Sequence, residues 1–212
     1  MRRRLILAAV ALVAGVCSAD AGQEARFDTA LELARSGQGA VAVAMFRQLA
    51  QAGDAAAQVN LAVMQARGQG LPQDEAMAAY WAWRARLAGE TRAVGLSDHL
   101  MTRLTEDARA ALAERLMQDL TAQVARGEMQ ALVGLGRIEM EIRSPARLQQ
   151  AALWFTLAAG FEVRQAMVLR EVVMRDLEPA QRLSVQVRAG ADFSRWCGVL
   201  ATEDRPRSCA AE

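Results

Sequence analysis

The sequence predicts an all-α fold in which antiparallel helix pairs stack into a right-handed superhelix, or solenoid. Apolar residues recur at intervals of three and four over most of the chain, which is the spacing of one face of a helix. Runs of β-branched residues that alternate with period two, the pattern of strands, do not occur. The chain also repeats itself, which is typical of stacked helical modules.

The internal repeat is visible without gaps. An alignment that pairs Trp81 with Trp154 also brings together Ala85 and Ala158, Ala93 and Ala166, Leu96 and Leu169, Met101 and Met174, Leu104 and Leu177, and Arg109 and Arg182. One further residue of offset pairs Gly53, Ala57, Val59 and Leu61 with Gly127, Ala131, Val133 and Leu135. Each module of such an array buries its apolar face only against its neighbours.

The helices are predicted from apolar spacing and from end signals. Gly37 and Gly39 close the first helix, Gly68 and Gly70 form a turn, and Thr105 is an N-cap followed by acidic residues. Ser144–Pro145 and Glu178–Pro179 indicate helix starts with proline in the first turn. The expected helices span residues 25–37, 40–53, 54–68, 73–88, 91–103, 105–126, 128–142, 145–159, 163–176 and 179–194.

Residues 53–81 form the clearest unit, two short helices that are rich in alanine and joined by a Gly-rich turn. This segment resembles the Sel1-like repeat, a relative of the tetratricopeptide repeat. The resemblance is carried by Gly53, Asp54, Ala55, Ala57, Gln58, Asn60, Leu61, Met64, Gly68, Gly70, Pro72, Asp74, Ala78, Tyr80 and Trp81. Val59 and Gln65 stand where the family usually has tyrosine, and residues 141–147 replace the Gly-rich turn in the second copy. The resemblance implies a protein-binding scaffold in which the first helix of each pair lines an inner wall.

Residues 1–21 are expected to be a secretory signal peptide. Arg2, Arg3 and Arg4 precede an apolar run from Leu5 to Cys17, and Ala19-Asp20-Ala21 resembles a cleavage site. An uncleaved anchor is the alternative, but the run is shorter than the about 17 to 25 residues that span a bilayer. A lipid anchor on Cys17 is disfavoured because Val16 precedes it. The protein is therefore expected in the periplasm or outside the cell, without membrane insertion after cleavage.

Two cysteines remain after cleavage, Cys197 and Cys209, and in an oxidising compartment a disulfide between them is expected. Two free thiols are the alternative. The repeat domain is expected over residues 22–196 and an irregular tail, held by the disulfide, over residues 197–212. The formal net charge of the whole chain is only +1 at pH 7, and no basic stripe is present, so nucleic acid is not an expected partner.

The sequence offers no convincing catalytic, cofactor or metal site. The one histidine, His99, aligns with Val172, which favours a packing role for it. Three acidic pairs, Asp74–Glu75, Glu106–Asp107 and Glu139–Glu141, could in principle act as acid and base across a scissile bond. The first two lie at helix starts, where the helix dipole favours carboxylates, and this explanation is preferred to catalysis. The GQG turn at residues 68–70 lacks the strand and the following Lys or Ser/Thr of a phosphate loop. By their helical spacing, Trp81, Trp83 and Trp154 are expected in the core.

Candidate partner-binding residues are those expected to face away from the stripe of Ala57, Leu61 and Met64, together with their counterparts on later helices. They are Asn60, Gln65, Arg67, Arg92, Asp98, Arg137, Glu141, Arg164, Arg170 and Glu171. For any one of them alone an ordinary solvated side chain is the preferred interpretation, and it is as a set that they mark a candidate surface.

Three functional hypotheses follow. The first is a non-enzymatic periplasmic adaptor that binds another protein in an envelope process such as cell-wall assembly, signalling, secretion or flagellar motor function. The second is a protein that binds or modifies peptidoglycan or β-lactams, as the resemblance to cysteine-rich secreted Sel1-like proteins implies, although those carry a disulfide in each repeat. The third is a self-associating structural protein of the envelope. The sequence does not name the partner or the oligomeric state.

Overall fold

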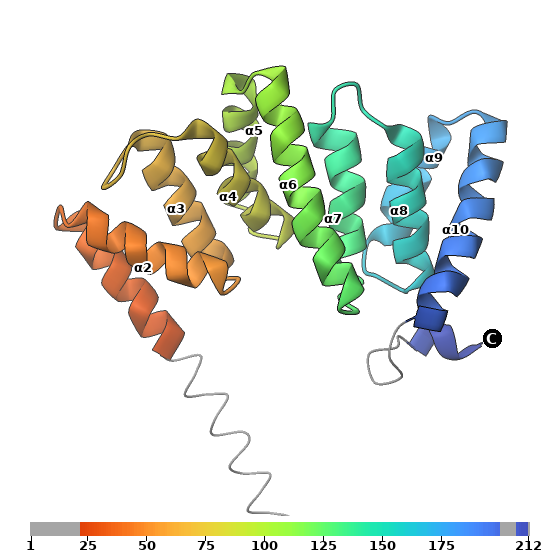
Figure 1. Cartoon of the computed structure of the whole chain (residues 1–212), viewed down its shortest axis with the longest axis horizontal. Coiled ribbons are helices and arrows are strands. Elements are labelled where there is room, and N and C mark those ends of the chain that lie inside the picture. The colour runs from red at the N-terminus through yellow and green to blue at the C-terminus, as the bar shows by residue number, and fades with distance from the viewer. Residues whose placement is uncertain (1–21, 200–206, 212) are drawn as a thin grey trace, which may run out of the picture. The chain divides into compact units, whose positions relative to one another are not determined.

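The computed structural model describes residues 22–199 and 207–211, and within these ranges the regular structure is entirely helical (Figure 1). The first helix covers residues 22–35. It is followed by α2 (Gly39–Gln51), α3 (Ala55–Arg67), α4 (Glu75–Leu87), α5 (Ala93–Arg103), α6 (Glu106–Ala125), α7 (Ala131–Arg137), the π-helix η1 (Ile138–Ile142), α8 (Leu148–Gly160), α9 (Ala166–Arg175), α10 (Pro179–Val199) and the 3-10 helix η2 (Arg207–Ala211). The predicted all-α class is confirmed.

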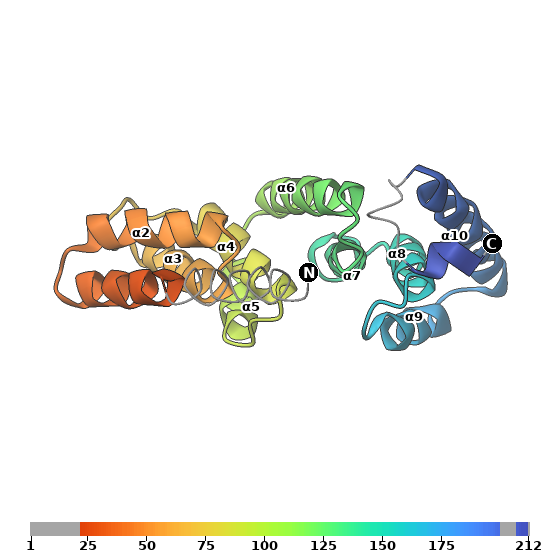
Figure 2. The same cartoon turned by 90° about the horizontal axis from the view of Figure 1, so that it is seen from below.

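The chain folds as two compact units, the first up to Arg103 and the second from Leu104. In the first unit α2 packs on α3, α3 on α4 and α4 on α5. In the second unit α6 packs on α7, α7 on α8, and α8 on both α9 and α10. From α2 to α4 and from α6 to α8 consecutive helices lie side by side, whereas α9 and α10 pack on different sides of α8 (Figures 1 and 2). The helix pairs predicted from the repeat are therefore present in both units.

Alanine allows the helices of the first unit to approach closely. On α3 and α4 six alanines are completely buried, namely Ala57, Ala62, Ala78, Ala79, Ala82 and Ala85. A side chain that ends at Cβ lets two helix backbones come close, and large neighbours then fill the remaining space. Trp83 is 1% exposed and Trp81 is 5% exposed, so both are core residues as predicted.

The Gly-rich turn of this unit is held against the start of α2. Gly70 has a left-handed φ of +79°, and a Cβ placed there would lie 2.2 Å from the carbonyl carbon of Gly39. Both features require glycine at residue 70, because an L side chain disfavours this conformation and no space exists for a methyl group.

The second unit uses glycine in the same way inside a helix. A Cβ at Gly136 of α7 would lie 2.4 Å from Cε1 of Phe155 on α8, and Phe155 is fully buried. Gly134 is similarly close to the Leu120 side chain of α6. Because neither glycine has a side chain, α7 can lie between α6 and α8 in contact with Leu120 on one side and Phe155 on the other.

Side-chain caps fix several helix starts. Asp54, Asp74 and Thr105 accept hydrogen bonds from the backbone N–H groups of Ala57, Met77 and Ala108. Thr105 is thus the N-cap that the sequence predicts, and the acidic residues 74–75 and 106–107 lie at helix starts.

Several predicted helix boundaries differ from the structure: α7, α8 and α9 each begin three residues later than predicted, and α10 ends later. Residue 145 does not start a helix: α8 begins at Leu148, and the Arg147 N–H donates to the Glu139 carbonyl, which closes the loop onto η1. At the other end of the unit, α10 begins at Pro179 as predicted but continues to Val199 rather than ending near residue 194.

Cys197 lies inside α10 and forms a disulfide with Cys209 of η2, with the two Cα atoms 5.3 Å apart. The expected irregular tail from residue 197 is therefore partly helical. The predicted signal peptide, residues 1–21, lies outside the described residues. Among the helices that are described, none combines the length and apolarity needed to cross a membrane.

Gly136→Ala should lower the free energy of unfolding by about 1 to 3 kcal/mol, because the added methyl group overlaps the buried Phe155 ring. Gly95→Ala is the matched control: Gly95 also lies inside a helix, but a Cβ there meets no atom within 4 Å. This control should be neutral or gain up to about 1 kcal/mol from helix propensity. Urea unfolding followed by circular dichroism measures both, and a Gly136→Ala protein as stable as the parent would contradict this account of α7 packing.

Candidate functional site

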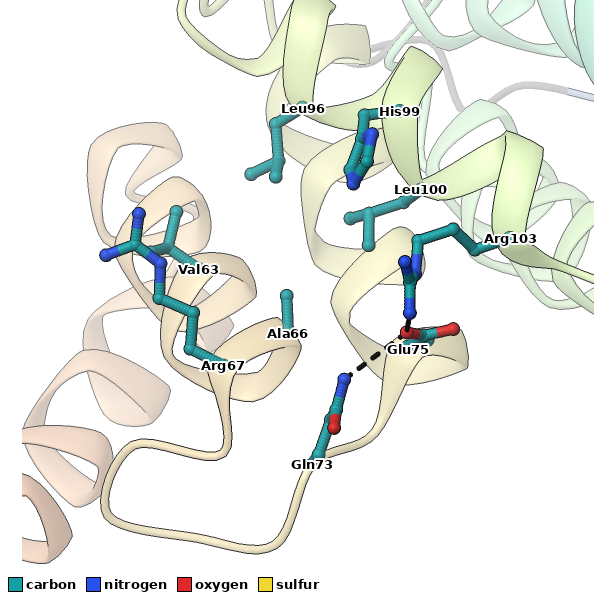
Figure 3. A pocket seen from close by; sticks show the side chains of 9 residues that line it. All are labelled: Val63, Ala66, Arg67, Gln73, Glu75, Leu96, His99, Leu100 and Arg103. Atoms are coloured by element: carbon teal, nitrogen blue, oxygen red, sulfur yellow. Dashed lines mark hydrogen bonds and ion pairs between the residues drawn. The ribbon is translucent and has the colours of Figure 1, made fainter.

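A pocket of about 390 Å³ opens in the first unit between α3 and α5, beside the start of α4 (Figure 3). We call it the α3–α5 groove. It is lined by Val63, Ala66, Arg67, Gln73, Glu75, Leu96, His99, Leu100 and Arg103.

One wall of the groove is apolar. Val63 and Ala66 come from α3, and Leu96 and Leu100 come from α5, four residues apart on the same face. Leu100 is 1% exposed, and Leu96 packs on the small core cluster of Val59, Ala85 and Ala93. The positions of these side chains are therefore fixed by the core of the first unit.

The polar part of the groove is basic. Arg67 and Arg103 lie on opposite sides of it, and His99 lies on α5 one turn before Arg103 (Figure 3). The only carboxylate of the lining is that of Glu75, which accepts hydrogen bonds from Arg103 Nε at 2.6 Å and from Gln73 Nε2 at 3.3 Å. The bond to Glu75 raises the pKa of Arg103 further above its usual value, so Arg103 stays charged. Among the described residues Arg67 has no hydrogen-bond or ion-pair partner for its side chain.

The prediction that His99 packs in the core is wrong. His99 is exposed, and its counterpart in the second copy, Val172, is 43% exposed. The position faces outward in both copies, so an apolar residue at the equivalent place indicated nothing about burial.

Three of the predicted partner-binding residues lie on α3, and they have different surroundings. Arg67 is exposed and lines the groove. Gln65 is only 5% exposed, which corrects its predicted exposure; it lies one turn after the buried Leu61 and so shares its face. Asn60 is half-buried and its Nδ2 donates to the Ala56 carbonyl at 2.9 Å.

Arg92 and Asp98 are exposed, but each forms an ion pair with a residue that precedes it in the chain. Arg92 contacts Glu90 through Nη2 at 2.9 Å and through its backbone N–H, and these bonds lower the pKa of Glu90 to about 2. Asp98 lies 2.5 Å from Nη1 of Arg86. Both pairs stabilise the connection from α4 into α5.

The remaining predicted residues belong to the second unit. Arg137 and Glu141 form an ion pair of 3.1 Å one helical turn apart, and Arg170 pairs with the adjacent Glu171 at 2.7 Å. Arg164 is exposed. Of the whole predicted set, only Arg67 lines the α3–α5 groove.

Sequence reasoning missed Arg103 and Glu75. Leu96, His99, Leu100 and Arg103 follow intervals of three and four, so the periodicity of α5 alone could have placed Arg103 beside His99. For Glu75 the sequence favours only a role at a helix start, which it also has.

A second group of charged residues lies in the second unit around Glu139. This residue of η1 is 2% exposed, and its Oε2 makes no hydrogen bond and lies 3.8 Å from Arg143 Nε. Arg143 also donates to Glu114 of α6 at 2.6 Å and so connects α6 with the end of η1. Burial raises the pKa of Glu139, and the charges of Arg143 and Arg147 oppose this rise.

Among the residues that the structure describes, no group of three or more His, Cys, Asp or Glu side chains is arranged to hold a metal ion.

No known family model matches the chain, and no curated protein sequence matches it. Among solved structures it is similar to c5321, a protective antigen present in uropathogenic Escherichia coli strains that displays an SLR fold. The two are 19% identical with a TM-score of 0.36, and the match covers 92% of this chain and 50% of that one. The chain thus spans about half the length of that protein, and a likeness this distant transfers no function.

Glu139→Gln should raise the free energy of unfolding at pH 7. Because burial raises the pKa of Glu139 in the folded protein, the unfolded chain loses this proton first, and between the two pKa values stability falls as pH rises. The glutamine variant lacks this slope, which urea unfolding between pH 4 and pH 8 would measure.

Glu114→Gln is the matched control, and the opposite sign is expected for it. The hydrogen bond from Arg143 lowers the pKa of Glu114, so its contribution is present above the usual pKa and is lost as pH falls. A Glu139→Gln protein less stable than the parent at pH 7 would mean that attraction to Arg143 outweighs the cost of burial.

Proposed function

We propose that this chain is an exported, non-enzymatic adaptor of the Sel1-like type, and that its α3–α5 groove binds a segment of another envelope protein. The observation that carries the proposal is the groove itself, in which an apolar wall lies beside two arginines and a histidine with a single carboxylate among them.

The chemistry of the groove favours a segment with an apolar side chain next to a carboxylate. Val63 and Leu96 offer apolar surface to the apolar side chain of the bound segment. Arg67 has no described partner, and Arg103 uses Nε and Nη2 for Glu75, which leaves Nη1 for an incoming carboxylate. Arginine suits this role because its planar guanidinium donates in fixed directions.

Binding rather than catalysis is favoured by the types of side chain in the lining. The nine lining residues include His99 as a possible base but no Ser, Thr, Cys, Lys or Tyr to act as its nucleophile. The Cys197–Cys209 disulfide fits an oxidising compartment, to which the predicted signal peptide would deliver the chain. Muropeptides also carry carboxylates, so cell-wall material is the competing ligand.

The paired substitution Arg67→Glu and Arg103→Glu should reduce recovery of the partner at least about tenfold, because two favourable contacts with a carboxylate become repulsive. The measurement is quantitative crosslinking and affinity capture from the envelope of the native host, with the mature protein as bait. Arg47→Glu is the control, since Arg47 is exposed on α2 and does not line the groove.

Equal recovery with the groove variant and the parent would rule out this groove as the binding surface. A thermal shift with muropeptides that disappears in the groove variant, without any protein recovered, would instead assign the groove to cell-wall material; a ligand at 100 times its Kd adds about 2.7 kcal/mol of stability.

A further inference from the structure

A second pocket, of about 520 Å³, lies in the second unit between the start of α8 and the turn that joins α9 to α10. We call it the α8–α10 pocket. The charged residues of its lining come from three elements: Arg147 directly precedes α8, Asp176 directly follows α9, and Arg188 lies on α10. A volume of this size is within the range of ligand-binding pockets.

The internal repeat places this pocket where the first unit has the α3–α5 groove. In the gapless alignment Glu75, the first residue of α4, corresponds to Leu148, the first residue of α8. Arg103, the last residue of α5, corresponds to Asp176, the residue directly after α9. Glu75 and Arg103 line the groove, and Leu148 and Asp176 line the α8–α10 pocket. The two pockets are therefore built at the same point of the repeat.

The contact that occupies this point differs between the two copies. In the first copy Arg103 Nε donates to Glu75 at 2.6 Å and so joins the end of α5 to the start of α4 (Figure 3). In the second copy Leu148 has no charge to offer Asp176. Asp176 is exposed, and its carboxylate forms no hydrogen bond or ion pair with any described residue. The second copy thus lacks this contact, and a carboxylate is left without a cation.

Two arginines of the same pocket are also without such contacts. Arg147 and Arg188 are exposed, and neither guanidinium makes a hydrogen bond or an ion pair within the part of the chain that the structure describes. The charge of Arg147 acts at longer range on Glu139 and Glu114, neither of which it contacts. The pocket therefore presents charges of both signs to an incoming ligand, and no ion pair joins its own charged residues.

Amide side chains of the lining can hold the backbone of a peptide. Gln181 Oε1 accepts a hydrogen bond from the Glu178 N–H at 3.0 Å, which leaves the Nε2 group of Gln181 as a donor. Gln149 and Gln150 of α8 also line the pocket. A primary amide both donates and accepts, as a peptide group does, so these side chains suit a peptide better than a small ion. Leu177, which is 5% exposed, adds a buried apolar side chain to the lining.

We propose that the α8–α10 pocket binds a peptide segment that carries an acidic and a basic side chain. The acidic side chain lies against Arg147 and Arg188, whose planar guanidinium groups suit a carboxylate, and the basic one lies against Asp176. Because these charged groups are exposed, the affinity should be modest and should fall with added salt. The inference does not rest on the proposed function, since the pocket lies in the second unit and its test uses defined peptides instead of a captured partner.

Fluorescence anisotropy with the purified mature protein measures the binding. The probes are labelled alanine peptides with capped ends, each with one glutamate and one lysine, at several separations in the peptide. The best of them should bind with a Kd below about 1 mM, and replacing its glutamate or its lysine by glutamine should weaken binding at least about threefold. Failure of every such peptide to bind at about 1 mM overturns the proposal, as does equal affinity for the peptide without charges.

Variants of the pocket assign each charge. Arg147→Gln combined with Arg188→Gln should weaken binding of the doubly charged peptide at least about threefold. Asp176→Lys should also weaken it, but should strengthen binding of the peptide that keeps only its glutamate, a change of sign that loss of folding cannot produce. Arg195→Gln is the control, because Arg195 is exposed on α10 and does not line the pocket, and its affinity should stay within about twofold of the parent. Circular dichroism checks that the variants are folded.

Two results with the variants would overturn the assignment. Unchanged affinity in both pocket variants would exclude the α8–α10 pocket as the site. Loss of binding in the paired Arg67→Glu and Arg103→Glu variant, with both pocket variants binding as the parent does, would place the peptide in the α3–α5 groove instead.

Discussion

Close approach of helix backbones is the constraint on which both units depend. In the first unit completely buried alanines such as Ala57 and Ala82 let α3 and α4 pack with little between them. In the second unit Gly136 has the same effect where α7 meets the Phe155 ring. Short side chains contribute little apolar area themselves, so stability must come from the large residues that close contact brings together, such as Trp83 and Leu100.

Several charged side chains near the helix ends of the described chain are engaged in local ion pairs. Arg86 with Asp98, Arg92 with Glu90 and Arg137 with Glu141 join residues close in sequence and stabilise the start of a helix or one of its turns. Such exposed pairs contribute little each, but they remove these side chains from the set that is free to bind a ligand. Arg67 differs because it stands at an apolar wall with no described partner, which is why the proposed function centres on it.

The sequence predicted the fold better than the site, for physical reasons. Helix class, the Thr105 cap and the start of α10 at Pro179 follow from local rules that act over one turn. The groove depends on how far apart α3 and α5 lie when both pack on α4. Rules that act over one helical turn do not predict this distance. The error at Gln65 could have been avoided, since a residue one turn after Leu61 shares its buried face. The π-helix at residues 138–142, by contrast, gives no periodic signal in so short a segment.

The two copies of the repeat carry different residues, His99 and Val172, at one equivalent exposed position, and this difference has a consequence for how the surface can vary. Because both side chains point away from the core, either residue can be replaced by one of different polarity without disturbing a buried contact. The residue at this position can therefore differ in polarity from one module to another while the buried alanines and glycines behind it stay the same. The surface chemistry of each module can thus change one substitution at a time, with the packed helices left intact.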